Sequence, residues 1–144
     1  MRLFLDANIL FSAVKSDGAV AAFVARLLDD GHECWVDGYV VDEARRNLMA
    51  KVPDRMPLLD RLMSRLRVAS VASSIARTTP HELADKDRPV LAAAVALACD
   101  ALVTGDRTHF GTFYGRTLTG VLMHSPRSLH DQLYPAKRAE PKNH

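Results

Sequence analysis

Short apolar runs alternate along the sequence with longer segments of helical periodicity, and this alternation restricts the fold more than any other feature. Apolar runs of the kind that form buried strands occupy residues 3–5, 33–36, 68–71, 102–104 and 121–123. Segments whose apolar side chains recur every three or four residues cover 18–30, 39–51, 59–66, 90–99 and 126–133. The alternation predicts a three-layer α/β/α sandwich built on a central, mostly parallel five-stranded sheet.

The length and the charge of the chain indicate one neutral domain with a basic extension. At 144 residues the sequence has the size of a single domain. We expect one domain over residues 1–134 and a basic, disordered tail over residues 135–144. The formal net charge is +2, and the tail accounts for it, because it holds three basic residues and one acidic residue. Nucleic-acid binding would therefore depend on a local basic patch and not on overall charge.

Several features argue against secretion or a membrane location. No apolar run approaches the roughly 20 residues that a membrane span needs, and Asp6 comes too early for a signal peptide. The two cysteines, Cys34 and Cys99, form neither a CxxC motif nor a zinc-type spacing. We expect them to be reduced core residues of a cytoplasmic protein that does not contact a membrane.

Four acidic residues fall where a parallel α/β sheet places its binding site. Asp6 directly follows the first predicted strand, and Asp106 follows the fourth. Asp87 stands at the start of the helix predicted over 90–99, and Glu43 lies in the first turns of the helix predicted over 39–51. Because such sites lie at the carboxyl ends of the strands, we expect all four side chains at one edge of the sheet.

Each acid has an ordinary structural explanation when it is taken singly, as a turn residue or a helix cap. Taken together, four carboxylates at one edge repel one another, and their pKa values rise unless a cation joins them. Mg²⁺ or Mn²⁺ would relieve this repulsion, because both prefer oxygen ligands and need only one or two direct carboxylates. Asn8, two residues after Asp6, and Thr104, two residues before Asp106, are placed to orient an acid or a water molecule.

Basic residues surround these acids in the sequence: Arg45, Arg46, Lys86, Arg88, Arg107 and His109. A negative metal site with a basic rim suits a phosphodiester substrate, because the metal takes the scissile phosphate and the rim takes its neighbours. We assign Arg45, Arg46, Arg88 and Arg107 to substrate binding on this ground. A solvated outer face is the ordinary explanation for any one of these residues alone.

Segments of the sequence resemble the PIN domain nucleases. They are residues 5–10 (LDANIL), 41–44 (VDEA), 87–92 (DRPVLA), 102–106 (LVTGD) and 125–127 (SPR). The resemblance covers residues 2–133 and implies a sandwich with a central parallel sheet that hydrolyses RNA with Mg²⁺ or Mn²⁺. It implies that the acidic cluster consists of four residues supported by Asn8 and Thr104: Asp6, Glu43, Asp87 and Asp106.

Short single-domain members of this family are commonly VapC-type toxins of bacterial toxin–antitoxin pairs. The resemblance therefore implies RNA as substrate, an antitoxin as partner and a homodimer. Two positions depart from the family pattern or blur it. Many members carry an acid or a serine two residues after the last aspartate, where this chain has Thr108. Asp85 competes with Asp87 as the third acid, and we choose Asp87 because it directly precedes the Arg-Pro opening of a helix.

Other α/β phosphoryl-transfer families fit less well. A haloacid-dehalogenase-like phosphatase uses a D-x-D motif, and the second place here is Asn8. A receiver domain needs an aspartate after the third strand and a lysine after the fifth, and residues 71–73 and 123–125 supply neither. There is no HExxH, GxSxG, P-loop or GxGxxG motif. The sequence leaves open a PIN-like nuclease acting on DNA or structured nucleic acid, and a non-catalytic PIN-like binding module.

Overall fold

The computed structural model describes residues 1–70, 85 and 87–136, without the side chains of residues 108 and 109. One sheet forms its centre, with the strands β1 (Arg2–Leu5), β2 (Glu33–Asp37), β3 (Arg67–Ala69), β4 (Ala101–Val103), β5 (Thr117–Leu118) and β6 (Val121–His124). The strand order is β3-β2-β1-β4-β6-β5, and each neighbouring pair is parallel except β5 and β6. The predicted mostly parallel sheet is confirmed, although the described residues form six strands and not five.

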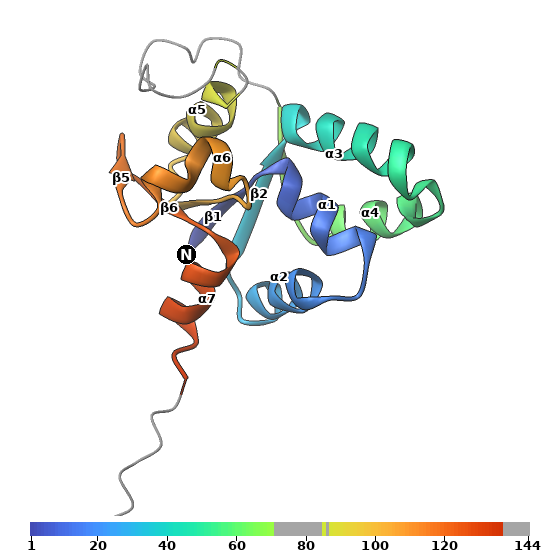
Figure 1. Ribbon diagram of the computed structural model, residues 1–144, viewed down its shortest axis with the longest axis horizontal. Coiled ribbons are helices and arrows are strands. Elements are labelled where there is room, and N and C mark those ends of the chain that lie inside the picture. The colour runs from blue at the N-terminus through green and yellow to red at the C-terminus, as the bar shows by residue number, and fades with distance from the viewer. Residues whose placement is uncertain (71–84, 86, 137–144) are drawn as a thin grey trace, which may run out of the picture.

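Helices cover the sheet on both sides and complete the predicted sandwich (Figure 1). They are α1 (Ala7–Lys15), α2 (Ala19–Asp29), α3 (Gly38–Lys51), α4 (Met56–Met63), α5 (Arg88–Ala96), α6 (Arg107–Phe110) and α7 (Pro126–Leu133), with short 3₁₀ turns η1 (Pro53–Arg55) and η2 (Gly111–Phe113). Helices α1 to α4 group on one side of the strands, and α5 and α6 lie on the other (Figure 1). Helix α7 packs against α2 and β6.

Several elements were not expected from the sequence: helix α1, strand β5, the short helix α6 and the two 3₁₀ turns. Helix α1 follows β1 after the single residue Asp6, and it buries Ala7, Ile9, Leu10 and Val14. Its apolar side chains run on from those of the strand, so no change of period marks its start. Strand β5 has two residues and forms a hairpin with β6, in which Thr119 and Gly120 both have positive φ. A strand this short shows no periodicity in the sequence.

Helix α5 fills the space against the sheet with small side chains, as expected. Residues 90–94 are buried, but the helix ends at Ala96 and not at Cys99. Ala98 takes a left-handed conformation with φ of 53°, which turns the chain toward β4. The third strand is Arg67–Ala69, one residue earlier than predicted at its start. The predictions for residue 71, the loop over 73–80, Lys86 and tail residues 137–144 lie outside the described part of the chain.

The sheet brings the carboxyl ends of β1 and β4 side by side. Leu5 pairs with Val103 in the parallel register, and the Asp6 N–H donates to the Val103 carbonyl at 3.0 Å. The Thr104 N–H donates to the carbonyl of His124, at the end of β6, also at 3.0 Å. Asp6 and Thr104, nearly 100 residues apart in the sequence, are therefore neighbours at one edge of the sheet.

Within the ranges described above, no single helix has both the length and the hydropathy that a membrane span requires. Helices α1 and α2 satisfy them only as a pair, which is bent by 108° at its break.

Candidate active site

Asp6 sits at the centre of the candidate site and is only 5% exposed. It is the N-cap residue of α1, and its Oδ1 accepts a hydrogen bond from the Ala7 N–H at 2.7 Å. Its Oδ2 accepts from the Thr104 hydroxyl at 2.8 Å and from the Asn8 amide at 3.3 Å. The Asp6 carboxylate therefore begins a helix and at the same time joins the ends of two strands.

Asn8 and Thr104 connect Asp6 to the loop that carries Asp106. The Asn8 Nδ2 donates to Thr104 Oγ1 at 3.2 Å, and the Asn8 Oδ1 accepts from the Gly105 N–H at 2.7 Å. The Asp106 N–H donates to Thr104 Oγ1 at 3.2 Å. The supporting positions predicted for Asn8 and Thr104 are thus both found in one hydrogen-bond network, which holds the loop after β4 against the end of β1.

Glu43 and Asp87 share the electrostatic environment of Asp6. Burial raises the pKa of Asp6 from 3.8 to about 6, against the lowering effect of its hydrogen bonds from Thr104 and Ala7. The negative charges of Glu43 and Asp87 raise the pKa of Asp6 further. Asp6 follows β1, Glu43 lies in α3 and Asp87 directly precedes α5, so these three elements bring their acids to one edge of the sheet.

Two tyrosines that were not predicted as site residues, Tyr39 and Tyr114, lie near the same acids. Burial raises the pKa of the Tyr39 hydroxyl, and the charges of Glu43, Asp87 and Asp6 raise it as well. Tyr39 lies in the first turn of α3, four residues before Glu43, and this spacing on one helix face is the signal that could have identified it.

Tyr114 lies near both Asp106 and Asp6. Burial, followed by the charge of Asp106 and a smaller effect of Asp6, raises the pKa of the Tyr114 hydroxyl. The hydroxyl donates to the Thr104 carbonyl at 2.7 Å. No feature of the sequence pattern indicates this contact, because Tyr114 lies beyond a 3₁₀ turn that was not expected. Asp6, Glu43, Asp87 and Asp106 thus gather at the carboxyl edge of the sheet.

The structure distinguishes the two candidates for the third acid. Asp87 is 6% exposed and is the N-cap residue of α5, although its side chain makes no capping hydrogen bond. The side chain of Asp85 is fully exposed and lies 3.7 Å from Arg88 in an ion pair. The geometry therefore favours Asp87, since its burial and its effect on the pKa of Asp6 place it within the cluster.

The four arginines assigned to substrate binding do not all reach this edge. Arg45 points toward α4, where its guanidinium pairs with Asp60 at 3.1 Å, so the geometry does not support a substrate role for it. A neighbouring residue on a helix is rotated by about 100°, which is why Arg45 and Arg46 face differently. Arg46 and Arg107 are exposed and lie close enough to Tyr39 and Tyr114, respectively, to lower the pKa of each hydroxyl. Arg88 pairs with Asp85, as described above.

Asp37, at the carboxyl end of β2, is buried like Asp6 and Asp87, and the structure explains it without a ligand. It is 2% exposed, it is the N-cap residue of α3, and it accepts from the Val40 N–H at 3.2 Å. Burial raises its pKa. We therefore treat Asp37 as a structural cap of the helix that carries Glu43.

The donor set at this edge suits a hard divalent cation. The predicted site residues offer carboxylate, amide and hydroxyl oxygens, and none of these residues is a cysteine or a histidine. Burial is the main cause of the raised pKa of Asp6, and the charges of Glu43 and Asp87 add to it; a bound cation would oppose both effects. In the described ranges, no three His, Cys, Asp or Glu side chains already form a ligand cluster. The fit to a cation therefore depends on the chemistry of the donor atoms.

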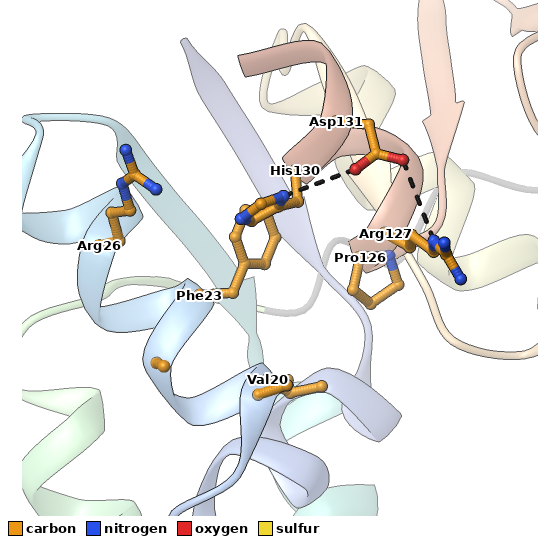
Figure 2. Close-up of a pocket in the computed structure, with 9 residues that line it drawn as sticks. Val20, Phe23, Arg26, Pro126, Arg127, His130 and Asp131 are labelled. Carbon is orange, nitrogen blue, oxygen red and sulfur yellow. Dashed lines mark ion pairs between the residues drawn. The ribbon is translucent and has the colours of Figure 1, made fainter. Parts of the chain in front are cut away.

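A groove with a volume of about 660 Å³ lies elsewhere, between α2 and α7 (Figure 2). Its lining is largely apolar, with Phe23 facing His130 at a ring distance of 5.5 Å. Arg127 and His130 each pair with Asp131 along its α7 wall (Figure 2). No member of the acidic cluster lines this groove, so it is separate from the candidate active site.

The fold is similar to those in crystal structures of VapBC2 from Rickettsia felis (TM-score 0.65, 18% identity, covering 87% of this chain and 98% of that chain) and of VapBC from Salmonella typhimurium (0.64, 12%, 88% and 98%). It is also similar to VapC20 from Mycobacterium tuberculosis, a toxin that cleaves the Sarcin-Ricin loop (0.57, 15%, 76% and 94%). Among curated proteins, no sequence matches significantly. A sequence model of the PIN domain family matches residues 2–108, most of the chain, and the chain therefore belongs to the PIN domain family.

Proposed function

We propose that this protein is an endoribonuclease that hydrolyses RNA phosphodiester bonds with Mg²⁺ or Mn²⁺. One observation carries the proposal: the Asp6–Asn8–Thr104 network holds the Asp106 loop beside Asp6, and Glu43 and Asp87 lie in the same electrostatic environment. Membership of the PIN domain family, whose members are nucleases, supports hydrolysis. The oxygen-only donor set supports a hard divalent cation.

The site residues have different roles: some would bind the cation, some position the ligands and some bind the substrate. Asp6, Glu43, Asp87 and Asp106 would hold the cation, which when bound polarises the scissile phosphate and lowers the pKa of a water molecule. Asn8 and Thr104 hold Asp6 and the Asp106 loop in one geometry, so that little reorganisation is needed on binding. The exposed Arg46 and Arg107 bind the phosphates on either side of the cleaved bond.

The test is cleavage of an end-labelled single-stranded RNA by the wild type in Mg²⁺, in Mn²⁺ and in EDTA. We expect cleavage with either metal and none in EDTA. Asp6→Asn should abolish cleavage, whereas Asp85→Asn, which changes a fully exposed carboxylate, should cleave like the wild type. Cleavage that survives full chelation would contradict the proposal.

Two arms of the same experiment decide between the remaining alternatives. A DNA strand of the same sequence and an RNA duplex test whether the enzyme acts on DNA or on structured nucleic acid. RNA binding without cleavage in either metal would instead indicate a non-catalytic binding module. We expect cleavage of the single-stranded RNA alone.

We further infer that the protein is the toxin of a toxin–antitoxin pair and acts in the cytoplasm. The support is the similarity of its fold to VapBC complexes, including one from Rickettsia felis bound to promoter DNA. Expression of the chain alone should arrest growth, and co-expression of a short neighbouring reading frame that encodes its antitoxin should restore growth. Asp6→Asn should be harmless without that frame, and arrest by this variant would contradict the inference.

A further inference from the structure

Two of the three tyrosines of this chain lie at the acidic edge, on opposite sides of Asp6. Tyr39 belongs to the first turn of α3, which follows β2, and Tyr114 follows η2, beyond β4. Strands β2 and β4 are the two neighbours of β1, so the tyrosines flank the end of β1 from both directions. Each side chain packs partly against the hydrophobic core and is partly exposed.

Tyr39, Glu43 and Arg46 form a stripe along α3. Their spacings of four and three residues place them on one face of the helix, one turn apart. The stripe begins with a ring, continues with a carboxylate of the acidic cluster and ends with an exposed guanidinium. An aromatic ring and a cation therefore flank Glu43 on the same helix face.

Tyr114 and Arg107 repeat this combination on the other side of Asp6. The Tyr114 hydroxyl is tied to the Thr104 carbonyl at 2.7 Å, and the next residue, Gly115, donates to the Met123 carbonyl at 2.9 Å. These bonds fix the ring beside the loop that carries Asp106. Arg107 directly follows Asp106 and is exposed.

The third tyrosine, Tyr134, has a structural role. The Tyr134 hydroxyl bonds to Asp30, and the Arg26 guanidinium covers its ring at 3.5 Å from the centroid. Tyr134 thus connects α7 to α2, away from the acids. It provides a natural control for the loss of a tyrosine ring.

We propose that Tyr39 with Arg46 and Tyr114 with Arg107 form two nucleotide subsites, in which the ring stacks on an unpaired base and the guanidinium binds a neighbouring phosphate. The inference rests on the proposed function and specifies its substrate class: RNA that is single-stranded on both sides of the cleaved bond. Stacking on aromatic rings tolerates every base, because every base has a π face, whereas a paired base cannot leave its helix without cost. Sequence preference would then come from other contacts.

The test combines tyrosine variants with abasic substrates. Steady-state cleavage in Mn²⁺ is measured for the wild type, Tyr39→Leu, Tyr114→Leu, Tyr39→Phe and Tyr134→Leu, on intact single-stranded RNA and on RNA with abasic nucleotides beside the mapped cleavage position. Each leucine variant at the acidic edge should raise KM by roughly 5- to 100-fold on intact RNA, the range expected for one lost stacking contact. Tyr39→Phe keeps the ring and should have a KM well below that of Tyr39→Leu, whereas Tyr134→Leu should stay near the wild type.

The abasic substrates separate stacking from a structural effect of the variants. The wild type should lose about the same factor when the stacked base is removed, and the leucine variant of that subsite should then lose little more. Equal losses by a leucine variant on intact and abasic RNA would overturn the proposal, as would a wild type that cleaves both RNAs with the same KM.

Binding of the same RNAs, measured by fluorescence anisotropy in EDTA, separates this inference from the proposed nuclease activity. If the wild type binds intact RNA more tightly than abasic RNA but does not cleave it in any metal, the nuclease proposal fails and the stacking subsites stand. If it cleaves RNA but neither binding nor KM depends on the two rings, the nuclease proposal stands and the subsites are wrong.

Discussion

Asp6 combines two roles that usually fall to different residues. As N-cap of α1 it satisfies a backbone donor, and as a buried carboxylate with a pKa of about 6 it resists ionisation. Its place after the first strand was predictable from the sequence, because strand ends meet at one edge. Its capping role was not predictable, because the apolar residues of β1 continue into α1 with no change of period that would mark the start of a helix.

The raised pKa of Asp6 predicts a specific pH dependence of stability in EDTA. The folded protein takes up this proton near pH 6, whereas the unfolded chain does so near 3.8, so the contribution of Asp6 to the free energy of unfolding rises as the pH falls between these values. Relative to Asp6→Asn, the wild type should gain about 2 kcal/mol between neutral pH and pH 4. Asparagine does not titrate in this range, so the change with pH in the difference between the two proteins reports the titration of Asp6.

Urea unfolding of both proteins at several pH values checks this prediction. The comparison with the variant is essential, because burial lowers the pKa of His124 and this residue contributes a slope of opposite sign. Parallel pH profiles for the two proteins would show that Asp6 titrates normally, and would contradict the raised pKa.

The adjacent residues Arg45 and Arg46 should behave differently when each is changed to alanine. Arg46→Ala should raise KM for RNA, whereas Arg45→Ala should leave KM unchanged and remove only an exposed ion pair to Asp60, an interaction worth about 1 kcal/mol at most. Cleavage kinetics and thermal melting of the two variants give the comparison. A larger KM effect for Arg45→Ala would restore the substrate role that its geometry argues against.

At the scale of elements, the strands and helices with a clear period were predictable, and those without one were not. Strand β2 and helices α3 and α7 lie within one or two residues of their predicted bounds. Helix α1 and strand β5 were missed, the first because its apolar residues continue those of β1 and the second because it has two residues. Tyr39 was missed although its helix was predicted, and Tyr114 was missed along with the 3₁₀ turn before it.

The network between β1 and the loop after β4 predicts that Asn8→Ala weakens metal binding without unfolding the protein. The change removes the bonds from Asn8 to Asp6, Thr104 and Gly105, and with them the constraint on the Asp106 loop. Residues that orient metal ligands typically account for 10- to 100-fold in metal affinity or activity, and we expect a loss of about that size. Mn²⁺ titration and circular dichroism of the variant test this; a wild-type Mn²⁺ affinity would contradict the role of the network.

At the scale of the whole molecule, the parallel topology creates the site. Four acids spread over 100 residues meet because β1 and β4 are adjacent and α3 and α5 begin at the same edge. This convergence could be predicted from strand ends alone. The directions of the arginine side chains could not be predicted in this way. Arg45 and Arg46 are adjacent and of the same type, and only their positions around the helix α3 decide that Arg45 faces Asp60.

We also propose, from the family resemblance, that the chain forms a homodimer. Analytical ultracentrifugation of the full chain should show a dimer at tens of micromolar, well above the dissociation constants of specific dimers. Sedimentation as a monomer throughout this range would contradict the proposal while leaving the candidate active site untouched.

Calorimetric titration with Mn²⁺ near neutral pH would show whether the acidic cluster binds a divalent cation through Asp6. The wild type and Asp85→Asn should bind Mn²⁺ with the same affinity, because the Asp85 carboxylate is fully exposed and outside the cluster. Asp6→Asn should lose at least about tenfold in affinity, since the ion loses a charged ligand. An Asp6→Asn protein that binds Mn²⁺ as tightly as the wild type would contradict the metal site and, with it, the proposed mechanism of RNA cleavage.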